Sequence, residues 1–207
     1  GVRYAGDQIA PLLDPSATIV LFIGRFTAVK RAALLVRAHA RARRRLSTPL
    51  PLVLWGGFPG EWEGEHPADA AARSPWGHEV FLAGWHDHED LPGALAAADV
   101  MAVPSVLERF GLAYVEAMAM NVPPIACATG APPTFIDADP ASPSRSGWLV
   151  PPDDEEALAD ALVAAVNDPA ERRRRGEAAR RTVRAKYAWP ALAERVADIY
   201  RDVSDSG

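Results

Sequence analysis

Short, almost wholly apolar runs alternate with longer amphipathic stretches along this chain. The run TIVLFIG at residues 18–24 is rich in β-branched residues and ends in glycine, which is typical of a buried strand. Similar runs occupy 51–57, 79–85, 100–105, 123–128 and 147–152. Because these runs are apolar throughout and do not alternate, they predict a sheet that is covered on both faces.

The stretches between these runs carry apolar residues at helical spacing and predict helices. Asp90 and Asp168 are expected N-caps, and Pro169 suits the first helical position. The segment 58–78 is rich in glycine and proline and is predicted to be a loop. The predicted helices are 28–46, 90–99, 111–120, 153–168, 168–187 and 190–203.

Strand–helix alternation predicts parallel strands joined by right-handed crossovers. The expected fold is therefore α/β: a doubly wound, parallel, six-stranded and Rossmann-like sheet with C-terminal helices, formed by residues 1–207 as a single domain. Sheets of this kind bind ligands beyond the carboxyl ends of their strands. The turns to search follow Gly24, Gly57, Gly84, Ser105 and Ala128.

Composition narrows the functional classes. The formal net charge of −5 argues against a general affinity for nucleic acid or acidic membranes. The single cysteine, Cys127, excludes an internal disulfide, and its apolar surroundings predict a buried, inert thiol. The longest apolar run is too short to span a membrane, so no transmembrane segment is expected. We expect a cytoplasmic protein.

Two cations follow the first predicted strand, in the sequence GRFTAVK. Gly24 permits a tight turn, Arg25 lies in the turn, and Lys30 is expected to enter the following helix. An arginine fork and a lysine point charge at one sheet edge suit a diphosphate. The alternative is a solvated helix start with incidental charges.

The turn after the fourth predicted strand contains ERFGLAYVE, with Glu108 before the apolar break 110–112 and Glu116 about one helical turn beyond it. The free N–H groups of a helix start bind anions, and Gly111 lets that backbone approach closely. Carboxylates beside a phosphate site accept hydrogen bonds from hydroxyls. A nucleotide sugar has both chemical features. The alternative is a helix-start acid and a solvent-facing acid, and the pattern alone leaves both interpretations open.

The chain resembles the C-terminal half of group 1 (family 4) retaining glycosyltransferases of the GT-B architecture. The resemblance covers nearly the whole chain in order, and the Glu-x7-Glu spacing with FGL inside and EAMA behind is its most specific part. The matching motifs are FIGRF with the following Lys, LVLWGG, VFLAGW, LAAADVMAVPS, ERFGLAYVEAMA, VPPIA, GWLVPPDD and YAWPALAERVADIY.

The resemblance implies a role for each matching residue. Arg25 and Lys30 would hold the donor diphosphate and stabilise charge on the leaving group, beside Gly24. Glu108 would contact hydroxyls of the transferred sugar, and Glu116 would bind the ribose hydroxyls. The backbone of Phe110, Gly111 and Leu112 would contact the sugar or the phosphates. These roles imply catalysis by Glu108, Arg25 and Lys30, a UDP- or GDP-sugar donor, and no metal or other cofactor.

The resemblance also implies that an N-terminal, acceptor-binding domain is missing, because the start GVRYAGD matches the family's crossing between domains. The isolated domain would then bind the donor and transfer little or no sugar to its acceptor, which is unknown. The high alanine and arginine content suggests a bacterial source, and the family implies polysaccharide or glycoconjugate biosynthesis.

Three residues depart from the family pattern: Arg31 and Asn121 replace glycines, and Thr134 in GAPPT replaces a glutamate. The changed GAPPT loop favours an alternative, a non-catalytic nucleotide- or sugar-binding interaction module, whereas the four intact charged residues oppose it. A related epimerase or phosphorylase is a third interpretation. The chain has no lysine-borne pyridoxal motif for a phosphorylase, and its FGL turn is less like an epimerase.

Three further features have simpler interpretations. HDHED at 86–90 contains metal-ligand residue types, but a solvated loop is favoured because consecutive residues rarely converge on one ion. The basic run 171–181 is expected to be a mostly solvated helix face. Trp55 and Trp85 end two predicted strands, where core packing is the default and stacking on a base is the alternative.

Overall fold

The computed structural model describes residues 17–205, which contain one six-stranded sheet in the order β3-β2-β1-β4-β5-β6. Every neighbouring pair of strands is parallel, so the predicted doubly wound α/β sheet is confirmed. The strands are β1 (Val20–Ile23), β2 (Leu52–Trp55), β3 (Val80–Gly84), β4 (Val100–Val103), β5 (Pro124–Cys127) and β6 (Trp148–Val150).

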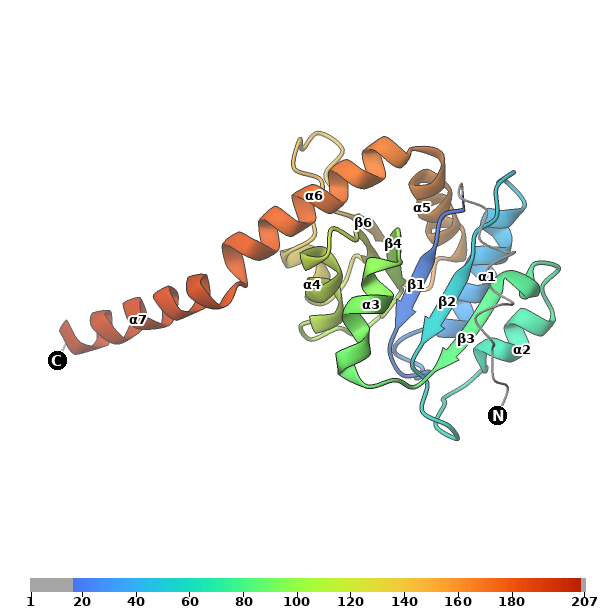
Figure 1. The fold of residues 1–207 in the computed structure, drawn as a ribbon, viewed down its shortest axis with the longest axis horizontal. Coiled ribbons are helices and arrows are strands. Elements are labelled where there is room, and N and C mark those ends of the chain that lie inside the picture. The colour runs from blue at the N-terminus through green and yellow to red at the C-terminus, as the bar shows by residue number, and fades with distance from the viewer. Residues whose placement is uncertain (1–16, 206–207) are drawn as a thin grey trace.

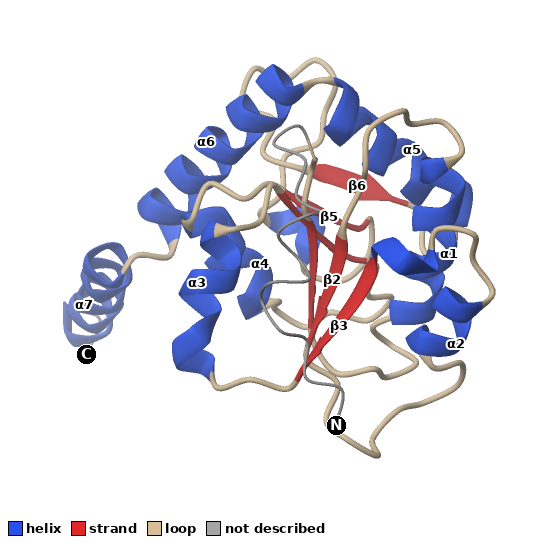
Figure 2. Ribbon diagram, turned by 45° about the vertical axis from the view of Figure 1, so that its right-hand side comes forward, coloured by secondary structure: helices blue, strands red, loops and turns tan. Residues whose placement is uncertain are grey.

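Helices cover both faces of this sheet (Figure 2). Helices α1, α2 and α5 lie on one face and α3 and α4 on the other, with α6 packed against α4. Helix α7 extends away from the sheet (Figure 1). The helices are α1 (Ala32–Arg43), α2 (Pro67–Ala72), α3 (Leu91–Ala96), α4 (Leu112–Ala119), α5 (Glu155–Asn167), α6 (Pro169–Lys186) and α7 (Trp189–Asp205), with 3-10 turns η3 (Gly77–Glu79), η4 (His88–Asp90) and η5 (Pro132–Thr134).

The central strands are apolar because both of their faces are buried. All residues of β4 and β5 are buried, and β1 contributes the fully buried Val20 and Phe22 to the core.

Cys127, at the end of β5, is buried as predicted, and burial raises the pKa of its thiol to about 11. The thiol is therefore protonated at neutral pH, which agrees with an inert core residue.

The start of α1 and the presence of α2 differ most from the sequence-based predictions. Helix α2 lies within the segment 58–78 that was predicted as a loop; Pro67 begins it, and the His66 side chain caps it by accepting from the N–H of Ala68. Helix α1 begins at Ala32 and not at residue 28, because Arg31 is left-handed with φ 56°. Lys30 therefore lies in the turn before the helix.

The predicted N-caps have different outcomes. The Asp168 carboxylate accepts from the N–H of Glu171, and Pro169 begins α6, as predicted. Asp90 precedes α3 but has helical backbone angles, and its side chain makes no capping bond, so that prediction was wrong. The physical reason is that η4 runs directly into α3 and already supplies a turn there.

The basic run 171–181 is less solvated than predicted. Arg175 is 8% exposed, lies 4.2 Å from the Trp148 ring centroid and donates to the carbonyl of Gly147. Arg172 pairs with Asp99 at 3.2 Å. Through these contacts the two arginines hold α6 against β6 and the loop before β4.

The strand order places the topological switch between β1 and β4. From β1 the chain proceeds outward through β2 to β3, and from β4 it proceeds the opposite way to β6. The turn after β1 and the turn after β4 therefore lie side by side at the carboxyl edge, where doubly wound sheets bind ligands. In the described part of the chain, no helix has the length and apolar character needed to cross a bilayer.

Candidate nucleotide-sugar site

Lys30 and Glu108 meet at the switch between β1 and β4. The Lys30 Nζ lies 2.6 Å from the Glu108 Oε2, although the residues are 78 positions apart in the chain. The two side chains are 26% and 13% exposed, so the pair is only partly screened by water. The two turns are also joined by their backbones, since the N–H of Val106 donates to the carbonyl of Val29 at 3.0 Å.

Helix α4 begins directly beside this pair, and its first residue is preceded by Gly111 with φ 87°. A Cβ on Gly111 would lie 2.6 Å from the buried Tyr114 ring, so this position requires glycine for both conformation and space. Among residues 17–205, no side chain caps this helix start. Its N–H groups and the positive end of the helix dipole are therefore available to an anion.

The changed GAPPT loop remains attached to Glu108. The N–H of Ala131 donates to the Glu108 carbonyl at 2.9 Å, and a Cβ on Gly130 would lie 2.5 Å from that same oxygen. The Thr134 hydroxyl donates to the Ala131 carbonyl at 2.7 Å. The loop therefore fixes the backbone of Glu108, while Thr134 stabilises the turn that the loop makes.

Arg25 lies at the same sheet edge but does not join Lys30 and Glu108. Its guanidinium pairs with Glu61 at 2.7 Å, and the two side chains are 68% and 53% exposed. Glu61 belongs to the loop between β2 and α2. The pair is a solvated contact, which contributes little stability and can exchange for another anion.

The β2–α2 loop also holds the turn after β1 and was not predicted to do so. Glu63 accepts from the N–H of Ala28 at 2.8 Å, and Trp62 forms an isolated parallel bridge with Phe26. The available signal was the acidic sequence GEWEGE at residues 60–65, shortly after the second predicted strand. Because β2 neighbours β1, acids beyond its end can reach the cations beyond β1.

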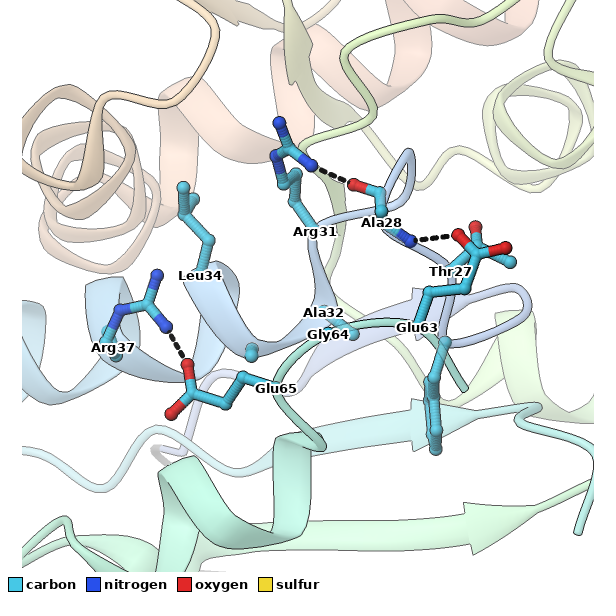
Figure 3. Close-up of a pocket in the computed structure, with 11 residues that line it drawn as sticks. Thr27, Ala28, Arg31, Ala32, Leu34, Arg37, Glu63, Gly64 and Glu65 are labelled. Atoms are coloured by element: carbon cyan, nitrogen blue, oxygen red, sulfur yellow. Dashed lines mark hydrogen bonds and ion pairs between the residues drawn. The ribbon is translucent and has the colours of Figure 1, made fainter. Parts of the chain in front are cut away.

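A hollow of about 180 Å³ lies between this loop and the start of α1. Figure 3 shows Glu63 meeting the N–H of Ala28, and Arg37 meeting Glu65, along its wall. Neither Lys30 nor Glu108 is among the described residues that line it. Its wall carries Glu63 and Glu65 as well as Arg31 and Arg37, and none of the described residues that line it belongs to α4. The hollow is therefore less suited to a diphosphate than the edge between β1 and β4.

Arg31, which replaces a glycine of the family pattern, makes a side-chain contact that glycine could not make. Its Nε lies 2.5 Å from Oδ1 of Asp153 and its Nη2 lies 3.1 Å from Oδ2, a two-pronged pair. Both residues are left-handed, with φ 56° and 58°. The bond to Asp153 raises the pKa of Arg31, and the bond to Arg31 lowers the pKa of Asp153. The pair connects the Lys30 turn to the loop before α5.

Glu116 points toward the loop after β3. Its Oε1 lies 2.9 Å from the Nε2 of His88, whereas the ring of His86 stacks on Trp55 with centroids 4.1 Å apart. The two histidines therefore do not converge, and in residues 17–205 no group of three metal-ligand residue types comes together.

Trp85 is 56% exposed, so its expected core packing was wrong.

The sequence model of the family described as glycosyl transferases group 1 matches residues 8–182. The chain belongs to this family. The match includes the turn after β1, the turn after β4 and the start of α4, so the predicted family resemblance is confirmed. The sheet order and the charged pair at its switch point thus belong to a glycosyltransferase domain.

Curated relatives and solved structures agree with this assignment. D-inositol 3-phosphate glycosyltransferase of Kineococcus radiotolerans is 34% identical over 194 residues, which cover 89% of this chain and 44% of that protein. The structure of sucrose-phosphate synthase from Thermosynechococcus elongatus has a TM-score of 0.76 and 33% identity, and the match covers 98% of this chain and 50% of that one.

HepE of Anabaena, solved in complex with UDP and glucose, superposes with a TM-score of 0.75. Its sequence is only 18% identical, and the match covers 94% of this chain and 51% of that one, so this likeness supports the fold alone. The chain spans about half the length of each of these proteins.

Proposed function

We propose that this chain is the donor-binding part of a retaining glycosyltransferase that uses a nucleoside-diphosphate sugar. The observation that carries the proposal is the Lys30–Glu108 pair beside the uncapped start of α4. A cation and a helix N-terminus attract the diphosphate, and a carboxylate beside them accepts hydroxyl groups of the sugar. A ligand of this class is also present in a protein of the same fold, since HepE was solved in complex with UDP and glucose.

In the proposed mechanism, the residues at the carboxyl edge between β1 and β4 have separate roles. Lys30, Arg25 and the N–H groups from Phe110 to Leu112 stabilise the negative charge that develops on the diphosphate as the sugar–phosphate bond breaks. Donor binding replaces the exposed contact of Arg25 with Glu61, at small cost because both side chains are solvated. The cations and the helix dipole supply the charge stabilisation, so no metal is invoked.

The two carboxylates bind the ends of the donor. Glu108 accepts hydrogen bonds from the transferred sugar, and Glu116 accepts them from the ribose. Glu108 holds Lys30 at 2.6 Å, so the donor enters a site whose charges are already oriented. Retention of the anomeric configuration belongs to this proposal, as does a UDP or GDP donor.

The acceptor binds outside this chain. Because the matched relatives are about twice as long, we assign acceptor binding to a further domain of the intact protein. The chain alone then binds the donor nucleotide and transfers little or no sugar. A cytoplasmic location and a role in bacterial polysaccharide or glycoconjugate synthesis stay predictions.

Calorimetric titration with UDP, GDP and ADP tests the proposal. One nucleotide should bind, and the variant Arg25→Ala/Lys30→Ala should bind it about 100-fold more weakly, because two charge-assisted contacts to phosphate are lost. A matched control is Arg41→Ala/Arg45→Ala, which removes two cations paired with α5 at the C-terminal end of α1, the opposite end from the Lys30 turn. Equal affinity in both double variants would contradict the proposed diphosphate site.

A second candidate is a non-catalytic module that binds nucleotide or sugar. The observation in its favour is Thr134, whose hydroxyl bonds to Ala131 and stands where the family has a glutamate. Nucleotide binding by this chain, combined with no sugar transfer and no donor hydrolysis by the intact protein, would favour the module over the enzyme.

A further inference from the structure

His88 and Glu116 form a contact across two different strand turns. His88 begins η4 after β3, and Glu116 lies within α4 after β4. The His88 Nε2 is 2.9 Å from the Glu116 Oε1. An ionised carboxylate only accepts hydrogen bonds, so Nε2 must carry the proton and donate it. The contact therefore favours a ring with a proton on Nε2 and gives the Glu116 carboxylate a preferred direction.

The loop that presents His88 is anchored on its neighbours. The ring of His86 stacks on Trp55 of β2 with an interplanar angle of 21°, and its Nε2 lies 3.0 Å from the Ala83 carbonyl. The N–H of Asp90 donates to the Asp87 carbonyl at 3.1 Å, which closes the turn around His88. His88 is thus held by a fixed backbone although its own side chain is 81% exposed.

The contact leaves part of Glu116 for a ligand. Only Oε1 meets His88, and no hydrogen bond to Oε2 is found among the described residues. Glu116 is 32% exposed, so its second oxygen can be reached from solvent. A glutamate on a helix surface otherwise samples several rotamers, and ordering it on binding costs affinity. Holding it beforehand removes that cost for a ligand with hydroxyls at this position.

We propose that His88 is a positioning residue that aims Glu116 at the ribose hydroxyls, and that this contact makes the site prefer ribonucleotides over dideoxynucleotides. This role rests on the proposed nucleotide site, because Glu116 meets ribose only if a nucleotide binds there. A site built to bond a hydroxyl rejects the analogue that lacks it, since its polar group then stays unpaired. A surface ion pair without this role would not distinguish the two nucleotides.

The test is calorimetric. The chain is titrated with whichever of UDP, GDP and ADP binds most tightly, and with the 2′,3′-dideoxy form of that nucleotide. Wild type is compared with His88→Ala, His88→Gln, Glu116→Gln and the double variant His88→Ala/Glu116→Gln. The matched control is His78→Ala, another exposed histidine near a glutamate but located before β3, at the opposite end of that strand. Circular dichroism checks that every variant folds.

The expected result is selective for the ribose. His88→Ala weakens ribonucleotide binding about 3- to 10-fold, leaves dideoxynucleotide binding unchanged, and has no further effect once Glu116 is glutamine. His88→Gln recovers affinity because its amide can donate from a similar position, and His78→Ala behaves as wild type.

Two results would overturn this role while leaving the nucleotide site intact. In the first, wild type binds the ribonucleotide and the dideoxynucleotide with equal affinity. In the second, His88→Ala changes neither affinity or weakens both to the same extent. Failure of wild type to bind any of the three nucleotides would instead reject the proposed function, and the role of His88 with it.

Discussion

The Lys30 ammonium and the Glu108 carboxylate lie 2.6 Å apart at the one place in the sheet where the direction of strand connection reverses. Both residues lie in turns, and contacts from other segments of the chain hold them in position. The turn of Lys30 is held by Val106 and Glu63, and the backbone of Glu108 is held by the loop containing Gly130. The pair is therefore a product of tertiary structure, and its two members should respond differently to substitution.

Lys30→Ala should weaken nucleotide-diphosphate binding about 10- to 100-fold, because it removes a charge-assisted contact to phosphate. It should also lower the free energy of unfolding by about 1–2 kcal/mol, since Glu108 is left only 13% exposed and without its cation. Adding Glu108→Gln should restore stability but not affinity. Calorimetry and urea unfolding measure the two effects; recovery of both together would show that Lys30 acts only structurally.

Gly130→Ala should weaken binding of a nucleotide sugar more than binding of the bare nucleotide. The added Cβ would lie 2.5 Å from the Glu108 carbonyl and would displace the residue proposed to hold the sugar. Gly60→Ala is the matched control, because Gly60 also has positive φ but no other described residue lies within 4 Å of a Cβ placed there. Titration of both variants checks this, and an equal loss of sugar selectivity in both would refute it.

Arg31→Gly should be about 1 kcal/mol more stable than Arg31→Ala. Both variants lose the pair with Asp153, but only glycine adopts φ 56° without strain. Denaturant unfolding of the two variants measures the difference. If Arg31→Ala proved as stable as Arg31→Gly, the left-handed conformation at residue 31 would depend on the ion pair with Asp153 and would be lost in both variants.

His39 should make the protein less stable as the pH falls below about 6.5, its ordinary pKa. Burial lowers the pKa of the folded His39, whose Nε2 lies 2.7 Å from the Leu50 carbonyl. The unfolded chain therefore binds a proton at a higher pH than the folded chain does, and protonation favours unfolding. The loss continues down to the lowered pKa of the folded state.

Urea unfolding between pH 8 and pH 5 measures this loss, with His39→Gln and His78→Gln compared. His39→Gln should remove most of the pH dependence because glutamine does not ionise. His78→Gln should leave most of it, because it removes only one of the neighbouring charges that lower the pKa of His39. Glu79 and Arg43 face His39 and are kept in both variants. An unchanged slope in His39→Gln would assign the pH dependence to other groups.

Much of the fold was predictable because the strands are short, apolar and bounded by glycine or proline. The same pattern failed for α2, whose six residues are too few to show a helical period inside a glycine-rich segment. It also failed at Arg31, where a single left-handed residue delays α1 and no local signal distinguishes arginine in this conformation.

The candidate site was predictable only in part. The turn positions of Lys30 and Glu108 follow from strand order, so their proximity could be expected. The partners Glu61, Asp153 and His88 could not, because they come from loops whose paths depend on packing with neighbouring elements. Arg25 shows the limit clearly, since its position in the chain suggests the same site and its side chain turns to Glu61.

The most direct test of the central claim is a crystal structure of this chain with the nucleoside diphosphate that binds most tightly. The account predicts that the diphosphate oxygens lie about 3 Å from the Lys30 Nζ and from N–H groups at the start of α4. A diphosphate seated instead in the hollow between α1 and residues 63–65, or away from the edge between β1 and β4, would contradict it.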